Sequence, residues 1–493
     1  MSSAKHSRRD FLKTAAASAT FLALPLSTST FAARARSARR PNILLAIADD
    51  WGWPHAGAYG DPVVNTAAFD RIAREGVLFE HAFVSAPSCT PCRNSLLTGQ
   101  QFYRLEEGAN LWSLLKTKFP VYPLLLERHG YSIGHWRKSW GPGSLKAGGY
   151  VKTHPVGQRF NGFADFMNKR PKDKPFCFWL GSSDPHRPYK PGTGKADGMD
   201  LSKVPVPGFY PDDPVVRSDI ADYYYEVQRF NRDVAAALEV LEDSGELENT
   251  IIVMTGDHGM PFPRCKANVY DMGVRVPLAI RWGARCKPGR RVTDFVSFTD
   301  LAPTFLEAAG VDIPEQMTGR SIMKILRSDS SGRVDPSRDH VVFGRERHVP
   351  VQKKPSLEAY PVRAIREDGW LCIHNLRPDL WPAGIPGDQG TAGSRRGMGD
   401  CDDGPTKLFI IENKDDAKVR RSYDLCFAKR PERELYDCTK DPYQLNNLAD
   451  NPECAQTMNR LSAKLEEYLR RTDDPRTTGK PHPFDTLPYP LRD

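Results

Sequence analysis

At residues 42–50 the sequence reads NILLAIADD, an unbroken apolar run that ends in two aspartates. An apolar run without polar alternation is typical of a strand buried on both faces of a parallel sheet. Two more runs of this kind, PFCFWL at residues 175–180 and TIIVMT at residues 250–255, are each followed by polar sequence that contains Gly, Asp and His. Because open α/β sheets bind ligands at the carboxyl ends of their strands, we expect the three strand ends to form one site.

Helical patterns separate these strands. They cover residues 69–75, 122–129 and 220–244, and Gly245 is suited to end the last of them. The alternation of strands and helices predicts a doubly wound α/β core. The fold class that we predict is therefore α/β, with a large, mostly parallel sheet flanked by helices.

The composition of the sequence changes near residue 332. From there on, Pro, Gly and charged residues are frequent, and the predicted strands are short. We predict a smaller C-terminal α+β subdomain at residues 341–493, after a main domain at residues 36–340. Within the subdomain, residues 382–403 are dense in Gly and Asp and are predicted to form a long surface loop.

The composition excludes several classes of protein. The chain has 493 residues, of which 40% are hydrophobic and 26% charged, so it can bury a core and is not disordered as a whole. The net charge is +8, and half of it lies in residues 1–35; the remaining +4 is mild and dispersed, so we expect no nucleic-acid partner. Ten cysteines are too dilute for a disulfide scaffold, and the sequence does not reveal whether any of them pair.

Residues 1–35 have the features of an export signal. The basic segment SRRDFLK at residues 7–13 precedes an apolar stretch that ends at Phe31, and small residues follow at 32–35. The arginine pair resembles the twin-arginine signal of bacteria, whose export machinery carries folded passengers. Pro25 and the lack of ~18 uninterrupted apolar residues argue against a stable membrane anchor. We therefore expect a periplasmic or secreted protein.

Asp49 and Asp50 are adjacent carboxylates at a buried strand end, where their charges repel each other. The repulsion is relieved if a cation lies between them or if one carboxylate is protonated, and a hard divalent cation is the simpler explanation. Asp257 and His258 follow another buried strand and can complete the ligand shell. The alternative is structural, with the aspartates acting only as a helix N-cap and its neighbour.

Residues 88–99 read SCTPCRNSLLTG. The Cys-x-x-Cys pair alone permits a redox disulfide or half of a zinc site, but the chain has no second Cys-x-x-Cys to complete such a zinc site. Cys89-x-Pro91-x-Arg93 followed by Leu-Thr-Gly instead resembles the signature of the type I sulfatases, a formylglycine-dependent family of the alkaline phosphatase superfamily. In that family the first Cys of the signature is oxidised to formylglycine (3-oxoalanine) before the enzyme works.

The resemblance covers most of the chain after residue 40. The matching segments are NILLAIADD at 42–50, DPH at 184–186, DHG at 257–259, Lys266, DLAPT at 300–304, ELYD at 434–437 and Asp441-Pro442. The strings DPHRP at 184–188 and PFP at 261–263 are most similar to the N-sulfoglucosamine sulfohydrolase (heparan N-sulfatase) branch of the family. The resemblance implies an alkaline-phosphatase-like fold and places the sulfatase catalytic domain within residues 36–340.

The resemblance also implies a role for each site residue. One calcium ion is bound by Asp49, Asp50, Asp257, His258 and the formylglycine oxygen derived from Cys89. Arg93 steadies the formylglycine hydrate, and Lys138, His186 and Lys266 hold sulfate oxygens. His186 or Lys266 also protonates the departing oxygen or nitrogen. Fixed cations around an anionic group provide the electrostatic stabilisation that such a reaction needs.

Three positions depart from the family pattern. Cys92 stands where Ser is common, and His258 replaces an Asn that many members have, which makes the ligand set softer. The third departure is Trp140. If Lys138 is the sulfate-binding lysine, Trp140 occupies the position of the His that deprotonates the reaction intermediate, and His135 is then a candidate for the missing base.

In the C-terminal part, Glu346 and His348 within RERH at residues 345–348 are candidates for binding substrate, and Trp381 is a further candidate for lining the pocket. The alternative is that these charged residues form an exposed loop.

These observations predict a sulfuric ester or sulfamate hydrolase that releases sulfate from a sulfated sugar or a glycosaminoglycan-like glycan. Such an enzyme depends on a formylglycine-generating enzyme to modify Cys89. A phosphoesterase or phosphonate hydrolase of the same superfamily is an alternative, although two-metal enzymes of that kind need more His and Asp ligands than we find in this chain. A second alternative is a sulfated-glycan-binding protein with altered catalysis, which the departure at Trp140 would explain.

Overall fold

The computed structural model describes residues 39–387 and 396–493. The predicted export signal at residues 1–35 lies outside these ranges, as do residues 388–395 of the predicted surface loop. Across the described residues, no helix has both the length and the apolar character that are needed to cross a membrane.

The core of the fold is an eight-stranded sheet with the strand order β4-β3-β5-β1-β6-β7-β2-β8. Its strands are β1 (Asn42–Ala48), β2 (Val77–Phe83), β3 (Ser132–Trp136), β4 (Gln158–Arg159), β5 (Phe176–Gly181), β6 (Thr250–Gly256), β7 (Leu278–Arg281) and β8 (Arg290–Ser297). The three apolar runs of the sequence form β1, β5 and β6, and β1 runs parallel to both of the others. Strand β7 runs antiparallel to β2 and β6. The predicted large, mostly parallel sheet is therefore confirmed.

The side chains of β1 alternate between two hydrophobic cores. Its odd-numbered residues from Ile43 to Ile47 belong to the core on one face of the sheet, and its even-numbered residues from Leu44 to Ala48 belong to the core on the other. Because both faces are covered, every residue of the strand is buried. This burial explains why the run is apolar without interruption.

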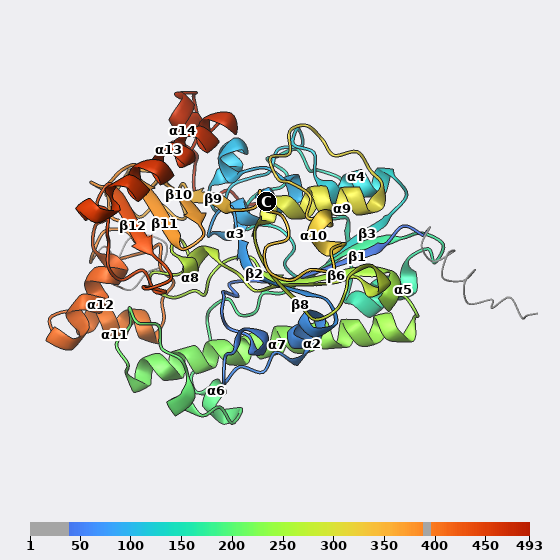
Figure 1. The fold of residues 1–493 in the computed structure, drawn as a ribbon, viewed down its shortest axis with the longest axis horizontal. Coiled ribbons are helices and arrows are strands. Elements are labelled where there is room, and N and C mark those ends of the chain that lie inside the picture. The colour runs from blue at the N-terminus through green and yellow to red at the C-terminus, as the bar shows by residue number, and fades with distance from the viewer. Residues whose placement is uncertain (1–38, 388–395) are drawn as a thin grey trace, which may run out of the picture. The chain divides into compact units, whose positions relative to one another are not determined.

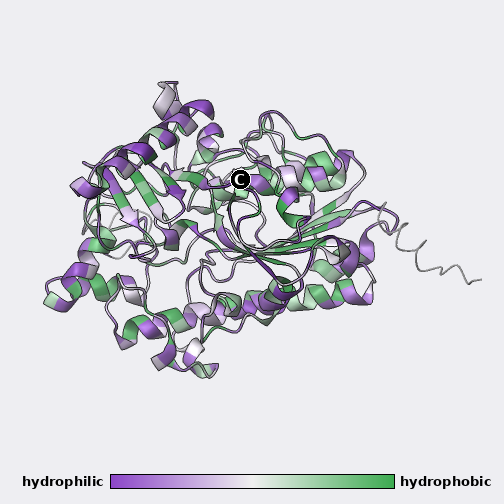
Figure 2. Ribbon diagram, viewed as in Figure 1, coloured by the Kyte–Doolittle hydropathy of each residue, from purple (hydrophilic) through white to green (hydrophobic). Residues whose placement is uncertain are grey.

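Helices cover both faces of the sheet (Figure 1). One core contains residues of α2 (Ala67–Glu75), α5 (Phe163–Lys169) and α7 (Pro214–Asp243), and the other contains residues of α4 (Tyr122–Arg128), α9 (Leu301–Ala309) and α10 (Met323–Leu326). Figure 2 shows hydrophobic and hydrophilic residues alternating along α7, as expected for a helix with one buried face. This helix begins at Pro214, earlier than predicted, because the side chain of Asp213 accepts a hydrogen bond from the N–H of Val215.

A second, antiparallel sheet has four strands in the order β12-β11-β10-β9. They are β9 (His340–Arg345), β10 (Val362–Glu367), β11 (Trp370–Asn375) and β12 (Arg433–Asp437). Apolar side chains of all four strands pack against α13 (Ala455–Arg471) in a separate small core. The predicted smaller α+β part is therefore present.

The remaining helices are α3 (Cys89–Thr98), α6 (Thr193–Ala196), α8 (Asp271–Val274), α11 (Pro405–Glu412), α12 (Ala417–Phe427) and α14 (Pro475–Thr478). All ten cysteines lie within the described residues, and all ten are free thiols. The redox-disulfide alternative for Cys89 and Cys92 is thus not realised in this structure.

The register of the central strands aligns the ends that carry the predicted site. Ala48 at the end of β1 is paired with Gly256 at the end of β6, and Ile47 is paired with Gly181 at the end of β5. The polar residues that follow these three strands therefore leave the sheet at the same edge, which is where parallel sheets place their ligands.

Candidate active site

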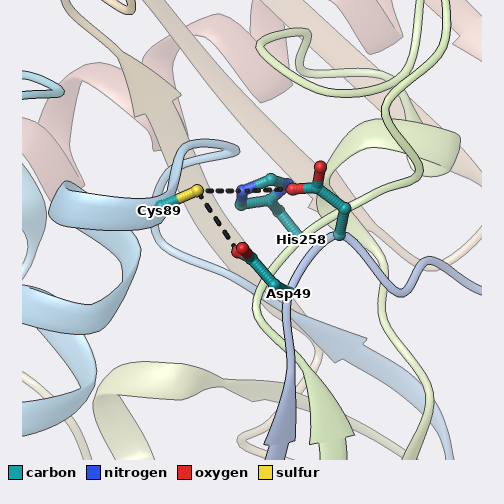
Figure 3. Close-up of side chains that lie close together, drawn as sticks. Asp49, Cys89 and His258 are labelled. Carbon is teal, nitrogen blue, oxygen red and sulfur yellow. Dashed lines mark hydrogen bonds and ion pairs between the residues drawn. The ribbon is translucent and has the colours of Figure 1, made fainter. Parts of the chain in front are cut away.

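The thiol of Cys89 lies where the ends of two central strands meet the start of α3 (Figure 3). Its Sγ atom is 3.5 Å from Oδ1 of Asp49, which follows β1, and 3.3 Å from Nε2 of His258, which follows β6. Cys89 is only 2% exposed. Burial and the nearby charge of Asp49 raise the pKa of this thiol well above its ordinary value, so the unmodified side chain is neutral.

Four of the five expected metal ligands converge. Asp49, Asp50, Cys89 and His258 each contribute one donor atom to a group in which all atoms lie within 4.8 Å of one another. The fifth, Asp257, lies beside this group, with its Oδ1 atom 3.5 Å from Nε2 of His258. The same Oδ1 atom accepts a hydrogen bond from the backbone N–H of Asp50.

Asp50 gives an independent reason to place a cation here. Its Oδ1 atom is buried and has no hydrogen-bond partner among the described residues. Its backbone has a φ of 71°, a left-handed conformation that few non-glycine residues adopt. A buried carboxylate oxygen without a donor is costly unless a cation binds it. The carboxylate-rich donor set therefore fits a hard divalent ion, with His258 as the softer member.

Arg93 forms ion pairs with two carboxylates of the candidate metal site. It is completely buried, and its Nε donates to Oδ2 of Asp257 at 2.9 Å. A further nitrogen donates to the carbonyl of Lys138, and another lies 3.7 Å from Oδ1 of Asp49. Cys92, one turn after Cys89, directs its thiol to the carbonyl of Asp257. Arg93 thus neutralises the carboxylates and holds three of the converging segments together.

Lys138 places a positive charge next to Asp49. Its Nζ lies 2.5 Å from both carboxylate oxygens. Burial alone would lower the pKa of Lys138, but the charge of Asp49 raises it to about 12. In turn, although burial would raise the pKa of Asp49, Lys138 together with His186 and other cations holds it well below its ordinary value. Both groups are charged at neutral pH.

Lys266 is the second buried cation of the site. Its Nζ is 2.9 Å from Oδ2 of Asp50 and 2.9 Å from Oδ2 of Asp402. Burial opposes its charge, but Asp402 and Asp50 raise its pKa well above the ordinary value. His186 approaches the same carboxylate, with its Nε2 3.9 Å from Oδ2 of Asp50, while its Nδ1 lies 2.7 Å from the carbonyl of Arg187.

Several of the side chains described above line one cavity of about 730 Å³. Cys89 and Asp49 lie in its wall, together with the three basic residues Lys138, His186 and Lys266. His348 also lines it, as predicted for a substrate contact, and one ring nitrogen lies 2.8 Å from Oγ of Ser88. Burial and the nearby Lys266 lower the pKa of His348 well below its ordinary value, so its ring is neutral at neutral pH.

The structure does not place Glu346 with His348. Glu346 is 1% exposed, does not appear among the described residues that line the cavity, and pairs with Arg363 of β10 and with Arg476. It follows β9 directly and faces the neighbouring strand, so ion pairing rather than substrate contact accounts for its charge. The alternative of an exposed loop is also wrong, because all four residues at 345–348 are buried.

Trp140, which stands where the family has a catalytic His, and His135, the candidate replacement for that base, have different surroundings. Trp140 lines the cavity, and its indole N–H donates to Oδ1 of Asn94 at 2.7 Å. His135 is not among the described residues that line the cavity; its ring stacks on His154 at 4.3 Å, and its Nδ1 lies 3.0 Å from the carbonyl of Gly157. The structure therefore gives no support to His135 as the base.

Sequence reasoning missed Asp402 and the aromatic residues Trp112 and Tyr489, which also line the cavity. Asp402 lies in the stretch that was predicted as a surface loop, yet it reaches Lys266. The adjacent carboxylates at 402 and 403 repeat the Asp-Asp pattern of residues 49 and 50, but the same pattern also occurs at 212–213, 415–416 and 473–474, so the sequence alone does not single them out.

The sheet and its strand ends define an α/β protein with a candidate metal site at the carboxyl ends of the central strands. The chain belongs to the sulfatase family, since residues 41–311 match the family model described as Sulfatase. It is 29% identical to human N-sulphoglucosamine sulphohydrolase over 486 residues, covering 89% of this chain and 91% of that protein. It is 26% identical to an ulvan-active sulfatase of Formosa agariphila, covering 88% of this chain and 76% of that one. The protein is thus a sulfatase, an enzyme that hydrolyses sulfate esters.

Solved structures support the fold. A structure determined with D-glucosamine-2-N,6-O-disulfate as its substrate is similar to this chain with a TM-score of 0.61 at 19% identity, covering 88% of this chain and 99% of that one. The phosphonate monoester hydrolase of Agrobacterium radiobacter gives a TM-score of 0.62 at 16% identity, covering 88% and 96%. At these identities the likeness concerns the fold alone.

Proposed function

We propose that this sulfatase releases inorganic sulfate from a sulfated sugar or glycan, as a sulfate ester or a sulfamate, with a formylglycine made from Cys89 and one bound calcium ion. The observation that carries the proposal is the position of Cys89. Its side chain lies in the wall of the cavity, within 3.5 Å of Asp49 and His258, and Lys138, His186 and Lys266 line the same cavity.

The residues that would hold calcium are Asp49, Asp50, Asp257 and His258, together with the modified side chain at position 89. The feature that fits a cation best is Oδ1 of Asp50, which accepts no hydrogen bond from the described residues and lies 3.4 Å from Nε2 of His258. When present, the hydrated formylglycine supplies a nucleophilic oxygen, and calcium supplies Lewis-acid polarisation of the sulfate.

The chain itself supplies charge and orientation. Lys138 and Lys266 are both protonated and fixed by carboxylates, so they can stabilise the negative charge of the sulfate oxygens without moving. Arg93 is buried behind the site and orients the carboxylate of Asp257 through an ion pair. Cations fixed before substrate arrives stabilise the transition state more effectively than mobile ones, because they need no reorganisation.

His186 is the better candidate for the proton donor to the leaving atom. Its Nδ1–H donates to the carbonyl of Arg187, so a protonated ring presents Nε2–H to the cavity. Lys266 has a pKa raised well above its ordinary value by its two carboxylates, and a strongly held proton is transferred less readily. We therefore assign the acid role to His186 and charge stabilisation to Lys266.

The names of two relatives support the proposed substrate class. The names of the relatives above refer to N-sulphoglucosamine and to ulvan, both sulfated sugars or glycans. We propose in addition that residues 1–35 direct export by the twin-arginine machinery to the periplasm or beyond, and that a formylglycine-generating enzyme modifies Cys89. The domain boundaries that go with this function are 36–340 for the catalytic domain and 341–493 for the smaller subdomain.

The experiment that tests the function combines mass spectrometry and turnover. Protein made in a host with a formylglycine-generating system is digested with trypsin, and the peptide of residues 75–93 is weighed. We expect an aldehyde at position 89 and a thiol at Cys92, together with sulfate release from 4-nitrophenyl sulfate. The Cys89→Ala variant is the control and should release none.

Two outcomes would contradict the proposal. An unmodified Cys89 in every competent host would exclude the formylglycine mechanism. Faster release of phosphate from 4-nitrophenyl phosphate than of sulfate from 4-nitrophenyl sulfate would favour a phosphoesterase, and tight calorimetric binding of sulfated sugar without any sulfate release would favour a binding protein.

A further inference from the structure

Asp402 puts a negative charge into a cavity that is otherwise suited to an anion. Its side chain is 29% exposed, lines the cavity and has Oδ2 2.9 Å from Nζ of Lys266. A carboxylate so close to a sulfate repels it, so its presence needs a compensating interaction. The ion pair with Lys266 compensates part of the charge of Asp402, but Lys266 is already paired with Asp50.

The carboxylate lies on the side of the cavity that faces the leaving atom. One oxygen of Asp402 belongs to a group in which a ring nitrogen of His186 and an oxygen of Asp50 all lie within 4.8 Å of one another. His186 is the residue to which the proposed function gives the proton for the leaving atom. A substrate bound for that transfer therefore brings its leaving group next to Asp402.

An ionised carboxylate accepts hydrogen bonds and donates none. Although burial would raise the pKa of Asp402, Lys266 and His186 lower it, so the side chain stays ionised. It therefore favours a leaving group that carries an N–H or O–H close to the sulfur and disfavours one that presents only acceptor oxygens. The surrounding burial strengthens this preference, because an unpaired charge is more costly away from water.

We propose that Asp402 is a specificity-determining residue that accepts a hydrogen bond from a donor group on the substrate next to the sulfur. This inference rests on the proposed function, because it uses the orientation of substrate between His186 and Lys266. Two groups of a sulfated sugar have this chemistry. One is the N–H of a sulfamate, and the other is a hydroxyl on the neighbouring ring carbon.

The test compares three substrates with wild-type enzyme and variants. Glucosamine N-sulfate carries both donors, glucose 2-O-sulfate carries the neighbouring hydroxyl without the N–H, and 4-nitrophenyl sulfate carries neither. For Asp402→Ala we expect the ratio of kcat/KM for glucosamine N-sulfate to that for 4-nitrophenyl sulfate to fall about tenfold to a hundredfold, as for a lost hydrogen bond to a charged group. Asp402→Asn, which keeps an acceptor oxygen, should lose less.

The neighbouring carboxylate supplies a matched control. Asp403 pairs with Lys407 instead of Lys266, at 2.8 Å, and is not among the described residues that line the cavity. The Asp403→Asn variant changes the chain by the same charge one residue away and should keep the wild-type ratio. A fall with glucosamine N-sulfate alone identifies the N–H as the donor, whereas a fall with glucose 2-O-sulfate as well identifies the neighbouring hydroxyl.

An equal loss on all three substrates would overturn the proposal, because Asp402 would then act only by positioning Lys266. An unchanged ratio in Asp402→Ala would overturn it as well. Failure of the proposed function is distinguishable, since it removes sulfate release from the wild-type enzyme. In that case calorimetric affinities of glucosamine N-sulfate and glucose 2-O-sulfate for wild type and Asp402→Ala decide the question, and equal affinities in the two proteins would refute the role of Asp402.

Discussion

Asp50 combines the most unfavourable features of the site: an unusual backbone conformation and a buried negative charge. It has a left-handed backbone, a buried oxygen that accepts no hydrogen bond from any described residue, and Asp49 and Asp257 as close acidic neighbours. Lys266 neutralises its other oxygen. Such an arrangement costs free energy in the protein alone, and a bound divalent cation would recover it.

We therefore predict that calcium stabilises the protein. Because a ligand that binds only the folded state raises the free energy of unfolding by mass action, calcium at about 100 times its Kd should add about 2.7 kcal/mol. Differential scanning calorimetry with calcium and with a chelator measures the change in Tm. Asp50→Asn should lose most of the response, and Asp300→Asn, at a buried ion pair with Arg338 outside this site, should keep it. A wild-type Tm that is indifferent to calcium would contradict the assignment.

Glu346 is expected to affect stability and leave substrate binding intact. It is buried between Arg363 and Arg476, and breaking a buried ion pair leaves a charge uncompensated. Glu346→Gln should lower the free energy of unfolding by about 3 kcal/mol and leave KM unchanged, as measured by urea unfolding and steady-state kinetics. The control is Glu358→Gln at the exposed pair with Arg377, where the loss should stay below about 1 kcal/mol. A raised KM at full stability would restore the substrate role predicted from the sequence.

At the scale of elements, the glycines at the strand ends let other segments approach the site. A Cβ atom on Gly181, the last residue of β5, would lie 1.8 Å from the carbonyl oxygen of Lys138. A Cβ atom on Gly256, the last residue of β6, would lie 2.0 Å from the carbonyl oxygen of Trp51. Neither contact is possible, so these positions bring the backbone of the site segments against the sheet.

Gly181→Ala should therefore displace the segment that carries Lys138. We expect a loss of about 1–3 kcal/mol in the free energy of unfolding, as for other overpacked positions, and a lower kcat/KM for 4-nitrophenyl sulfate. Gly310→Ala is a useful comparison, because Gly310 ends α9 with a φ of 69° and has open space where a Cβ would be. Its backbone strain alone should cost about 1 kcal/mol without a change in kcat/KM. Equal effects of the two variants on activity would show that the close approach at Gly181 is unimportant.

The elements near the center of the sheet could be predicted because burial dictates their composition. Strands β1, β5 and β6 are buried throughout, and apolar residues occupy nearly all of their positions. The same pattern fixes where each strand ends, so Asp49, Asp50, Asp257 and His258 were predicted at the correct edge. The N-terminal start of α7 was missed because a single hydrogen bond, from the N–H of Val215 to the side chain of Asp213, determines it.

The contributions of the loops could not be predicted in this way. Asp402 and Glu346 are both acidic residues in charged stretches, and one lines the cavity while the other pairs with arginines. Local sequence carries no information about which distant cation each will meet. His135 and His348 show the same difficulty, since both are largely buried histidines and only His348 reaches the cavity.

At the scale of the whole molecule, buried histidines make stability depend on pH. Burial lowers the pKa of His135 to about 4 from an ordinary value of 6.5. Between these values the unfolded chain binds more protons than the folded protein, so the free energy of unfolding falls as the pH falls from 6.5 to 4. The contribution of one such histidine is at most about 1.4 kcal/mol per pH unit.

His135→Gln should therefore flatten this pH dependence relative to the wild type. Urea unfolding at pH 7 and pH 5 measures the difference, and the variant should lose less stability between the two than the wild-type protein does. His129→Gln is the control, because His129 is exposed, and its pH dependence should match the wild type. An identical loss in all three proteins would mean that His135 is protonated as easily in the folded state as in the unfolded chain.

The ten free thiols have a consequence for the order in which the protein folds, is transported and is modified. No covalent cross-link has to form for the chain to reach its native state, so folding needs no oxidant and proceeds in a reducing environment. The chain can therefore fold before it is transported, and most of its residues need no chemical step while the chain is unfolded. Position 89 is the exception, because the folded protein leaves only 2% of that residue accessible. If Cys89 is modified as proposed, the modifying enzyme must reach it before the chain has folded around it, so the time between synthesis and folding would limit the fraction of molecules that carry the modification.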